Sequence, residues 1–229
     1  MPFVHLHVHS HHSLLSGASS PEELVQAAKR LGMTSLALTD TNTTGGLVLF
    51  LKACRSEGIK PILGAELADH RDPSQRIVVL SRGQKGWGDL CELVTMHTLR
   101  RRGPDLEDLF YRPWPELVFL CPHPETLQRL AHTPIRPQLW GELVCHDPFS
   151  RHCAQAVAGI AKDEGLPLVV GGDVHFAQSL DFTRHLALCA IAKGCSIDKL
   201  PLHHHQPPGA WLKPESRLRE TFARAPEAM

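Results

Sequence analysis

The chain opens on three histidines that alternate with apolar residues, a pattern that can hold a metal ion. His5, His7 and His9 occupy every second position of a segment that predicts a β-strand over residues 2–9. Side chains at alternate positions of a strand point to one face, so we expect the three imidazoles to stand side by side. Neutral imidazole is the commonest protein ligand for transition metals. The segment therefore predicts the start of a metal site, with a solvated edge strand as the alternative.

A second pair of ligand-type residues follows late in the chain. Asp173 and His175 repeat the spacing of His7 and His9, and Glu66 ends a predicted strand between the two pairs. A His-x-His pair alone is a weak signal, but the three features together are much stronger. Carboxylates can bridge two cations, so this set of residues suits a hydrolytic centre that clamps phosphoryl oxygens.

Alternating strand and helix signals supply a frame that can position these residues. About seven β-α units with short connections predict a parallel sheet, closed into a barrel or doubly wound. In such barrels the chemistry lies at the carboxyl ends of the strands. Polar residues gather at those predicted ends, namely His7, His9, Asp40, Glu66, His123, Asp173 and His175.

Composition narrows the class of protein. The 229 residues suffice for one large α/β domain or two small ones, and 42% of them are hydrophobic. Lys+Arg and Asp+Glu both number 24, so the net charge is zero and indicates neither a nucleic-acid nor an acidic partner. The seven cysteines form no C-x-x-C pair, which is typical of reduced thiols in a cytosolic protein. No signal peptide or long apolar run is present, so we expect a soluble, cytoplasmic protein without a membrane partner.

Several motifs together resemble the PHP (polymerase and histidinol phosphatase) domain. They lie at residues 3–10, 13–19, 37–40, 58–66 and 172–176. The similarity is greatest to the version at the N-terminus of bacterial DNA polymerase III alpha subunits. The stretch 211–228 resembles the segment that joins that domain to the polymerase palm. The resemblance covers essentially the whole chain and implies an α/β fold, a distorted (β/α)7 barrel of PHP type over residues 1–200, followed by a tail over 201–229.

The resemblance also implies up to three clustered divalent metals. The first would be held by residues that are all present, namely His7, His9, Glu66 and Asp173. Glu66 would hold the second together with His123, and His175 is the ligand of the third that this chain retains. If the site is active, His9, Glu66 and Asp173 would carry catalysis through a metal-activated water.

Three positions depart from the family's pattern. Ser16 stands in place of an acid, Thr41 in place of a histidine, and Arg76 in place of the second metal's other histidine. A hydroxyl is a poor substitute for these ligands, and a guanidinium has no lone pair to offer. Arg76 could instead contact a phosphate or satisfy Glu66. We therefore expect one sound metal position, a doubtful second and a third mostly lost, and thus one to two ions of zinc or manganese, with iron as a further candidate.

Two functions from different classes remain open. The first, which the lost third position favours, is a mainly structural or docking module of a polymerase III alpha-like subunit in DNA replication or repair synthesis. The second is an active metal-dependent phosphoesterase: a 3′–5′ exonuclease, a pyrophosphatase or a phosphatase of the histidinol-phosphate type, with His11 or His12 able to supply a missing ligand. The chain has no polymerase active site. Its expected partners are the remainder of a polymerase alpha-like chain or other replisome subunits, with DNA as a further candidate.

Overall fold

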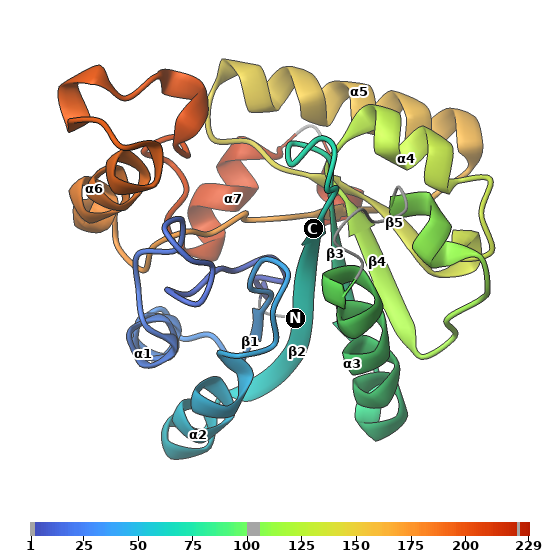
Figure 1. Ribbon diagram of the computed structural model, residues 1–229, viewed down its shortest axis with the longest axis horizontal. Helices are drawn as coiled ribbons and strands as arrows, with labels where there is room; N and C mark the ends of the chain where they lie inside the picture. Colours follow the sequence, from blue (N-terminus) through green and yellow to red (C-terminus); the bar gives the residue numbers. More distant parts are fainter. Residues whose placement is uncertain (1–2, 100–105, 224) are drawn as a thin grey trace.

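One curled sheet carries most of these residues. In the computed structural model, which describes residues 3–99, 106–223 and 225–229, six strands form a single sheet. Their order in the sheet is their order in the chain, as Figure 1 shows. The strands are β1 (Ser35–Leu38), β2 (Lys60–Ala68), β3 (Arg76–Ser81), β4 (Leu117–Cys121), β5 (Leu139–Leu143) and β6 (Leu168–Val170).

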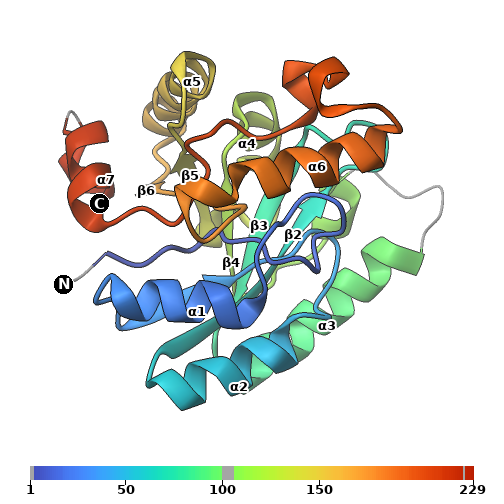
Figure 2. The ribbon, with the colours of Figure 1, turned by 90° about the vertical axis from the view of Figure 1, so that its left-hand side faces the viewer.

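Helices cover the outside of the sheet, and local residues set where they begin and end. Ser20 and Glu23 form a capping box at the start of α1, and Gly58 and Gly165 end α2 and α5 in the left-handed conformation that glycine adopts freely. Helices α1 and α2 lie side by side, as do α4 and α5 (Figures 1 and 2). The helices are α1 (Pro21–Arg30), α2 (Leu47–Glu57), α3 (Gly83–Leu99), α4 (Pro124–Leu130), α5 (Pro148–Glu164), α6 (Phe182–Lys193) and α7 (Glu215–Thr221).

The segment that carries the first histidines closes the barrel as an irregular seventh strand. On one side the amide of Ala37 in β1 donates to the carbonyl of His5 at 3.0 Å. On the other side the amide of His9 donates to the carbonyl of Val174 at 2.7 Å. This confirms the distorted barrel. A regular strand over residues 2–9 is wrong for the described part, because a single bridge, at Val8, is formed there; Pro2 lies outside the described residues.

A side-chain hydrogen bond explains part of this irregularity. The amide of Val8 donates to the hydroxyl of Thr39 at 2.9 Å instead of to a backbone carbonyl of β1. Hydroxyls that compete for backbone partners interrupt regular ladders.

The sheet is mixed rather than parallel. Strand β3 runs antiparallel to both β2 and β4, while the other neighbouring pairs are parallel. The segment 69–75 that joins β2 to β3 is too short for the crossover of a dozen or more residues that parallel neighbours need. Within it the Asp69 carboxylate accepts from the amide of Arg71 at 2.7 Å, which stabilises the tight turn.

The inward-facing side chains of the barrel form an apolar cluster and, next to it, a polar layer. Val78 pairs with Leu120 across the sheet and both pack in an interior cluster. Glu66 pairs with Val78, so it faces inward too. Trp140 belongs to the same cluster, and Glu142 lies two positions further along β5 on the same face. The carboxylates of Glu66 and Glu142 therefore both face the barrel interior, next to the apolar cluster.

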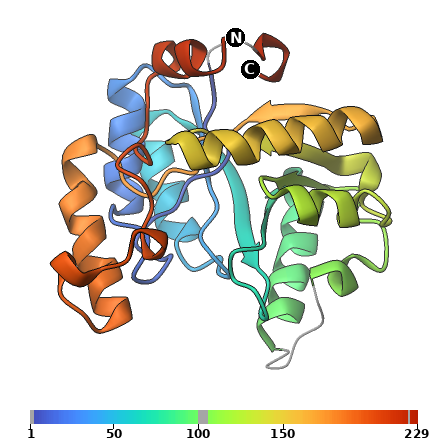
Figure 3. The ribbon, with the colours of Figure 1, turned by 90° about the horizontal axis from the view of Figure 1, so that it is seen from above.

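The tail packs against the barrel. Trp211 forms a parallel bridge with Phe176, and Leu212 is fully buried in the cluster beneath α1 and α2. The amide of Phe3 donates to the Glu215 carboxylate in α7 at 2.8 Å, so the two ends of the described chain lie close together (Figure 3). The boundary at residue 200 stays a prediction.

A buried histidine in α3 is expected to make stability depend on pH. The ring of His97 stacks on that of His70 at 4.2 Å, and burial, together with the charge of His70, lowers the pKa of His97 to about 4. The unfolded chain binds a proton on this ring near pH 6.5. The stabilising contribution of the neutral His97 ring is therefore complete above that pH and is lost as the pH falls to about 4. We expect His97→Phe to reduce the acid loss of unfolding free energy by on the order of 1–3 kcal/mol, measured by urea denaturation.

The matched control is His152→Phe, which replaces an exposed histidine. It should leave the pH dependence as in the parent chain. An identical acid slope in the His97→Phe and parent chains would contradict the assignment.

Candidate metal centre

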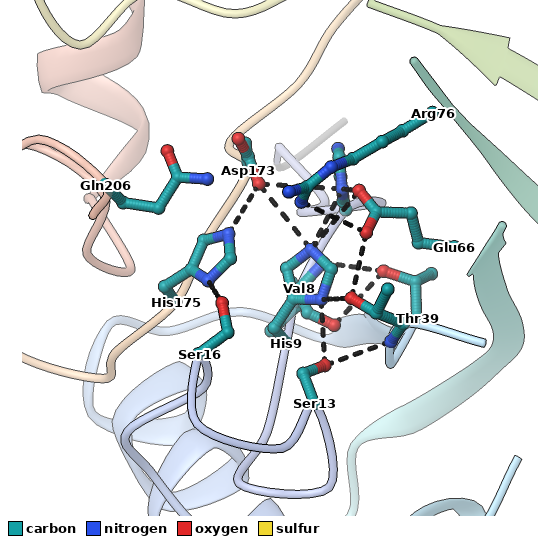
Figure 4. A network of polar contacts seen from close by, with 12 residues as sticks. Val8, His9, Ser13, Ser16, Thr39, Glu66, Arg76, Asp173, His175 and Gln206 are labelled. Carbon is teal, nitrogen blue, oxygen red and sulfur yellow. Dashed lines mark hydrogen bonds and ion pairs between the residues drawn. The ribbon is translucent and has the colours of Figure 1, made fainter. Parts of the chain in front are cut away.

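Four side chains from three distant parts of the chain meet inside the barrel. Nε2 of His7 lies 3.0 Å from Nε2 of His9, 3.2 Å from Oε2 of Glu66 and 3.6 Å from Oδ1 of Asp173. Nε2 of His9 lies 3.5 Å from the same Asp173 oxygen. The two histidines and Glu66 are buried, and Figure 4 shows how His9, Glu66 and Asp173 converge. The structure thus brings together the residues expected to hold a first metal.

The backbone aims each of these groups. His7 and His9 alternate along the closing segment, and Glu66 faces inward from β2. Asp173 follows β6 with φ of 35°, in the left-handed region that a residue with a side chain rarely adopts. Strained conformations of this kind persist where the surrounding structure holds them and gather at functional sites.

A relay of hydrogen bonds orients His9. The Ser13 hydroxyl donates to the Asp40 carboxylate at 2.8 Å and accepts the amide of Thr41 at 3.0 Å. It therefore accepts from Nδ1 of His9, which lies 3.0 Å away. The bonding pattern leaves the Nε2 lone pair of His9 facing His7. Asp40, which also accepts from the amide of Ser10 at 2.6 Å, acts on His9 through Ser13.

Charge around His7 favours a cation at this place. Burial lowers the pKa of His7, but the carboxylates of Glu142 and Asp173 and hydrogen bonds to Glu142 and Glu66 outweigh it and raise the pKa well above its usual value. Burial would also raise the pKa of Asp173, yet the neighbouring histidines, His7 foremost, hold it well below its usual range. Two imidazoles and two ionised carboxylates form a donor set that fits a divalent cation such as zinc or manganese.

Two of the departures from the family's pattern meet on Glu66. Its Oε1 accepts from the Thr41 hydroxyl at 2.8 Å and from Nη1 of Arg76 at 3.3 Å, while its Oε2 faces His7. Burial would raise the pKa of Glu66, but Arg76, His9 and His7 together lower it strongly. One carboxylate oxygen is thus free for the first metal position, and the other is held by Arg76.

The third departure, Ser16, contacts His175. Nε2 of His175 lies 3.0 Å from Oδ1 of Asp173, and its Nδ1 lies 3.0 Å from the Ser16 hydroxyl. Burial and the charge of His9 lower the pKa of His175 to about 3, so the ring is neutral. Because the ionised Asp173 carboxylate can only accept, the single ring proton sits on Nε2, and Nδ1 accepts from the Ser16 hydroxyl. His175 also stacks on His9 at 4.3 Å, and its role as a ligand stays a prediction.

Two other predicted positions lie outside this cluster. Among the described residues, two groups have ligand atoms close enough to share an ion: His7 with His9 and Glu66, and His9 with Asp173 and His175. His123 belongs to neither group. It precedes α4, where burial and the charge of Arg76 lower its pKa. His5 does not stand beside His7 and His9 as the alternation predicted, because its Nε2 donates to the carbonyl of Lys213 in the tail at 2.9 Å.

A cavity of about 490 Å³ opens beside the cluster. Polar groups that line it include the hydroxyls of Ser13, Ser16, Thr41 and Thr43, together with His12 and Arg76. Gln206, which follows α6 in the chain, points its amide toward Asp173 and His175 (Figure 4). The hydroxyls of Ser13, Ser16 and Thr41 already donate to other side chains, so a small anionic group would find mainly the guanidinium of Arg76 here.

Sequence reasoning missed Glu142. Its two carboxylate oxygens lie 3.1 and 3.0 Å from Nδ1 of His7, on the side of the ring opposite Glu66. The available signal was a single acid at an inward position of the apolar strand β5, since acids are almost never fully buried without a partner.

Comparison with known proteins identifies relatives by sequence and by fold. A family model described as the PHP domain matches residues 5–143. DNA polymerase III subunit alpha of Bacillus subtilis is 29% identical over 250 residues, which cover 100% of this chain and 22% of that protein. The corresponding subunit of Escherichia coli is 30% identical over 258 residues, covering 99% of this chain and 22% of that protein.

An error-prone DNA polymerase of Pseudomonas fluorescens is 36% identical over 184 residues, covering 76% of this chain and 17% of that protein. This chain therefore spans about a fifth of the length of these curated relatives. Among solved structures, a Bifidobacterium adolescentis protein described as a metal-dependent phosphoesterase aligns with a TM-score of 0.50 and 19% identity, over 76% of this chain and 89% of that one. That likeness supports the fold.

Proposed function

The chain belongs to the PHP domain family, and from that premise we propose that it holds one divalent cation and acts mainly as a structural or docking module of a DNA polymerase III alpha-like protein. One observation carries the metal site. The Nε2 atoms of His7 and His9 face each other at 3.0 Å while the Nδ1 atom of each ring is engaged elsewhere. Two imidazoles so oriented, with two carboxylates beside them, form a metal-binding arrangement.

In this proposal His7, His9, Glu66 and Asp173 hold the cation, which is zinc or manganese, with iron as a further candidate. A bound divalent cation supplies Lewis acidity and charge stabilisation for phosphoester chemistry. Around it, Ser13 holds the ring of His9 and His175 holds the Asp173 carboxylate. The contacts of His7 and His9 with Asp173 span the seam between the N-terminal segment and the residues after β6, so a cation held there would join the two as a structural metal.

The departures at Ser16, Thr41 and Arg76 favour the structural role over the catalytic one. Arg76 binds the Glu66 oxygen that a second cation would share, and both ring nitrogens of His175 are engaged, by Asp173 and by Ser16. Clamping both the attacking and the leaving oxygen of a phosphoester usually takes two metals. In the proposal the module's partners are the rest of a polymerase alpha-like chain or other replisome subunits, with DNA as a further candidate.

The alternative is a phosphoesterase that uses Arg76 in place of the second cation. The observation in its favour is the cavity, where hydroxyls and the guanidinium lie beside Glu66. In that alternative Arg76 binds a phosphoryl oxygen, and the hydroxyls of Thr41 and Ser16 would leave Glu66 and His175 to donate to the ester. Arg–phosphate contacts of this kind are strong and directional.

Metal content per chain tests the proposal. We expect mass spectrometry of the purified, cation-loaded protein to find one divalent ion per chain, and His7→Ala to lose it, because the replaced imidazole touches each of the other three donors. No ion in the parent chain, or an equal content in the variant, would overturn it.

Turnover then separates the two candidate functions. Hydrolysis of a phosphomonoester or pyrophosphate with added manganese, abolished by His9→Ala and by Arg76→Gln, would favour the phosphoesterase. Turnover indifferent to both changes would indicate a contaminating enzyme.

A further inference from the structure

The carboxylate of Glu142 is buried with no exposed surface and directed at a single ring. It faces inward from β5, and both of its oxygens lie within 3.1 Å of Nδ1 of His7. Burying an ionised carboxylate is costly unless a partner compensates it. The partner that compensates the buried carboxylate of Glu142 is the ring of His7.

The neighbouring backbone is shaped to admit this carboxylate. A Cβ atom built on Gly171 would lie 1.8 Å from Oε1 of Glu142, so a residue with a side chain here would displace the acid. Gly171 thus leaves the space that Glu142 occupies. Its amide donates at 3.0 Å to the carbonyl of Leu143, which lies beside Glu142 in β5.

We propose that Glu142 is the positioning residue for His7: it accepts the Nδ1 proton and thereby turns the Nε2 lone pair toward His9, Glu66 and Asp173. The inference rests on the proposed metal site. A carboxylate behind a histidine ligand fixes its tautomer and ring angle and increases its basicity. His9 receives a weaker version of the same support, because its Nδ1 meets the neutral hydroxyl of Ser13.

Two substitutions at Glu142 separate its charge from its hydrogen bond. Glu142→Gln keeps an oxygen that accepts from Nδ1 but removes the charge, and Glu142→Ala removes both. We expect the dissociation constant for zinc, measured by competition with a chromophoric chelator, to rise about 10- to 100-fold in Glu142→Ala and by less in Glu142→Gln. Glu142→Gln preserves the volume of the site, so it remains informative should the alanine variant fail to fold.

A third substitution moves the carboxylate without changing it. Gly171→Ala leaves Glu142 in the sequence but occupies its place, so zinc affinity should fall as in Glu142→Ala. The matched control is Gly159→Ala in α5, where an added Cβ meets nothing within 4 Å. That control should bind zinc like the parent chain.

A spectroscopic readout tests the positioning independently of metal binding. In the cation-free protein, ¹H–¹⁵N spectra of labelled histidine should show a protected, far-downfield Nδ1 proton that disappears in His7→Ala and in Glu142→Ala. Absence of that signal from the parent chain overturns the inference.

The outcomes distinguish the inference from the function beneath it. A parent chain that binds no zinc but shows the proton signal defeats the proposed metal site and leaves the positioning intact. A parent chain that binds zinc with the same affinity as Glu142→Ala and Glu142→Gln leaves the metal site standing and overturns the role of Glu142.

Discussion

Removing the divalent cation is expected to lower the free energy of unfolding by about 4 kcal/mol, compared with protein kept at a thousandfold excess of cation over its dissociation constant. The cation binds the folded chain alone, because its ligands come together only when the N-terminal segment reaches Glu66 and Asp173. For a chain of this size that loss corresponds to a fall in melting temperature of roughly 8–16 °C. Calorimetry before and after stringent chelation measures it.

The control is His7→Ala, whose melting temperature should not respond to cation or chelator. A parent chain whose melting temperature is also unaffected by chelation would show that the cation contributes nothing to the fold. The docking role would then have to be carried by the protein surface alone.

Arg76→His is expected to double the number of divalent cations bound per chain, from one to two. The imidazole would replace a side chain that cannot ligate and would release Oε1 of Glu66, to which Arg76 now donates. The charges of Arg76 and Glu66 both act on the ring of His123. His123 would therefore be the third donor, beside Glu66 and the new histidine. Metal analysis after loading with manganese measures the number.

Arg76→Gln is the matched variant, since it removes the guanidinium without adding an imidazole. It should remain at one ion per chain. If Arg76→His also binds one ion, then more than the identity of residue 76 prevents the second metal from binding, and Thr41 on the same Glu66 oxygen becomes the next position to change.

Much of the fold was predictable because its signals are local. The cap at Ser20 and the glycine at Gly58 mark helix ends in the sequence as in the structure. The antiparallel β3 was missed, although the short polar stretch 69–75 forbids a crossover. The irregular first strand could not be foreseen, since the hydroxyl that takes the amide of Val8 comes from Thr39, which the sequence does not place beside it.

The residues of the candidate site were predictable from the sequence, but several of their contacts were not. Alternation and strand ends placed His7, His9, Glu66 and Asp173 among the candidate residues, and the family resemblance implied that these four hold one metal. The hydrogen bonds that set the roles of Ser16 and Arg76 depend on distances between segments, which spacing along the chain does not give. Glu142 was missed for this reason, as its partner lies 135 positions away.

The seam at which the N-terminal segment meets Val174 also sets when this centre can form. A ribosome makes His7 before Asp173, and at 5–20 residues per second the interval between the two is roughly 8–33 s. During that interval the site lacks the Asp173 carboxylate, and the N-terminal segment lacks its partner at Val174. Contacts so distant in sequence slow folding. Cation capture would therefore be a late event, and a chain stalled before residue 173 would present exposed imidazoles to chaperones and to adventitious metals.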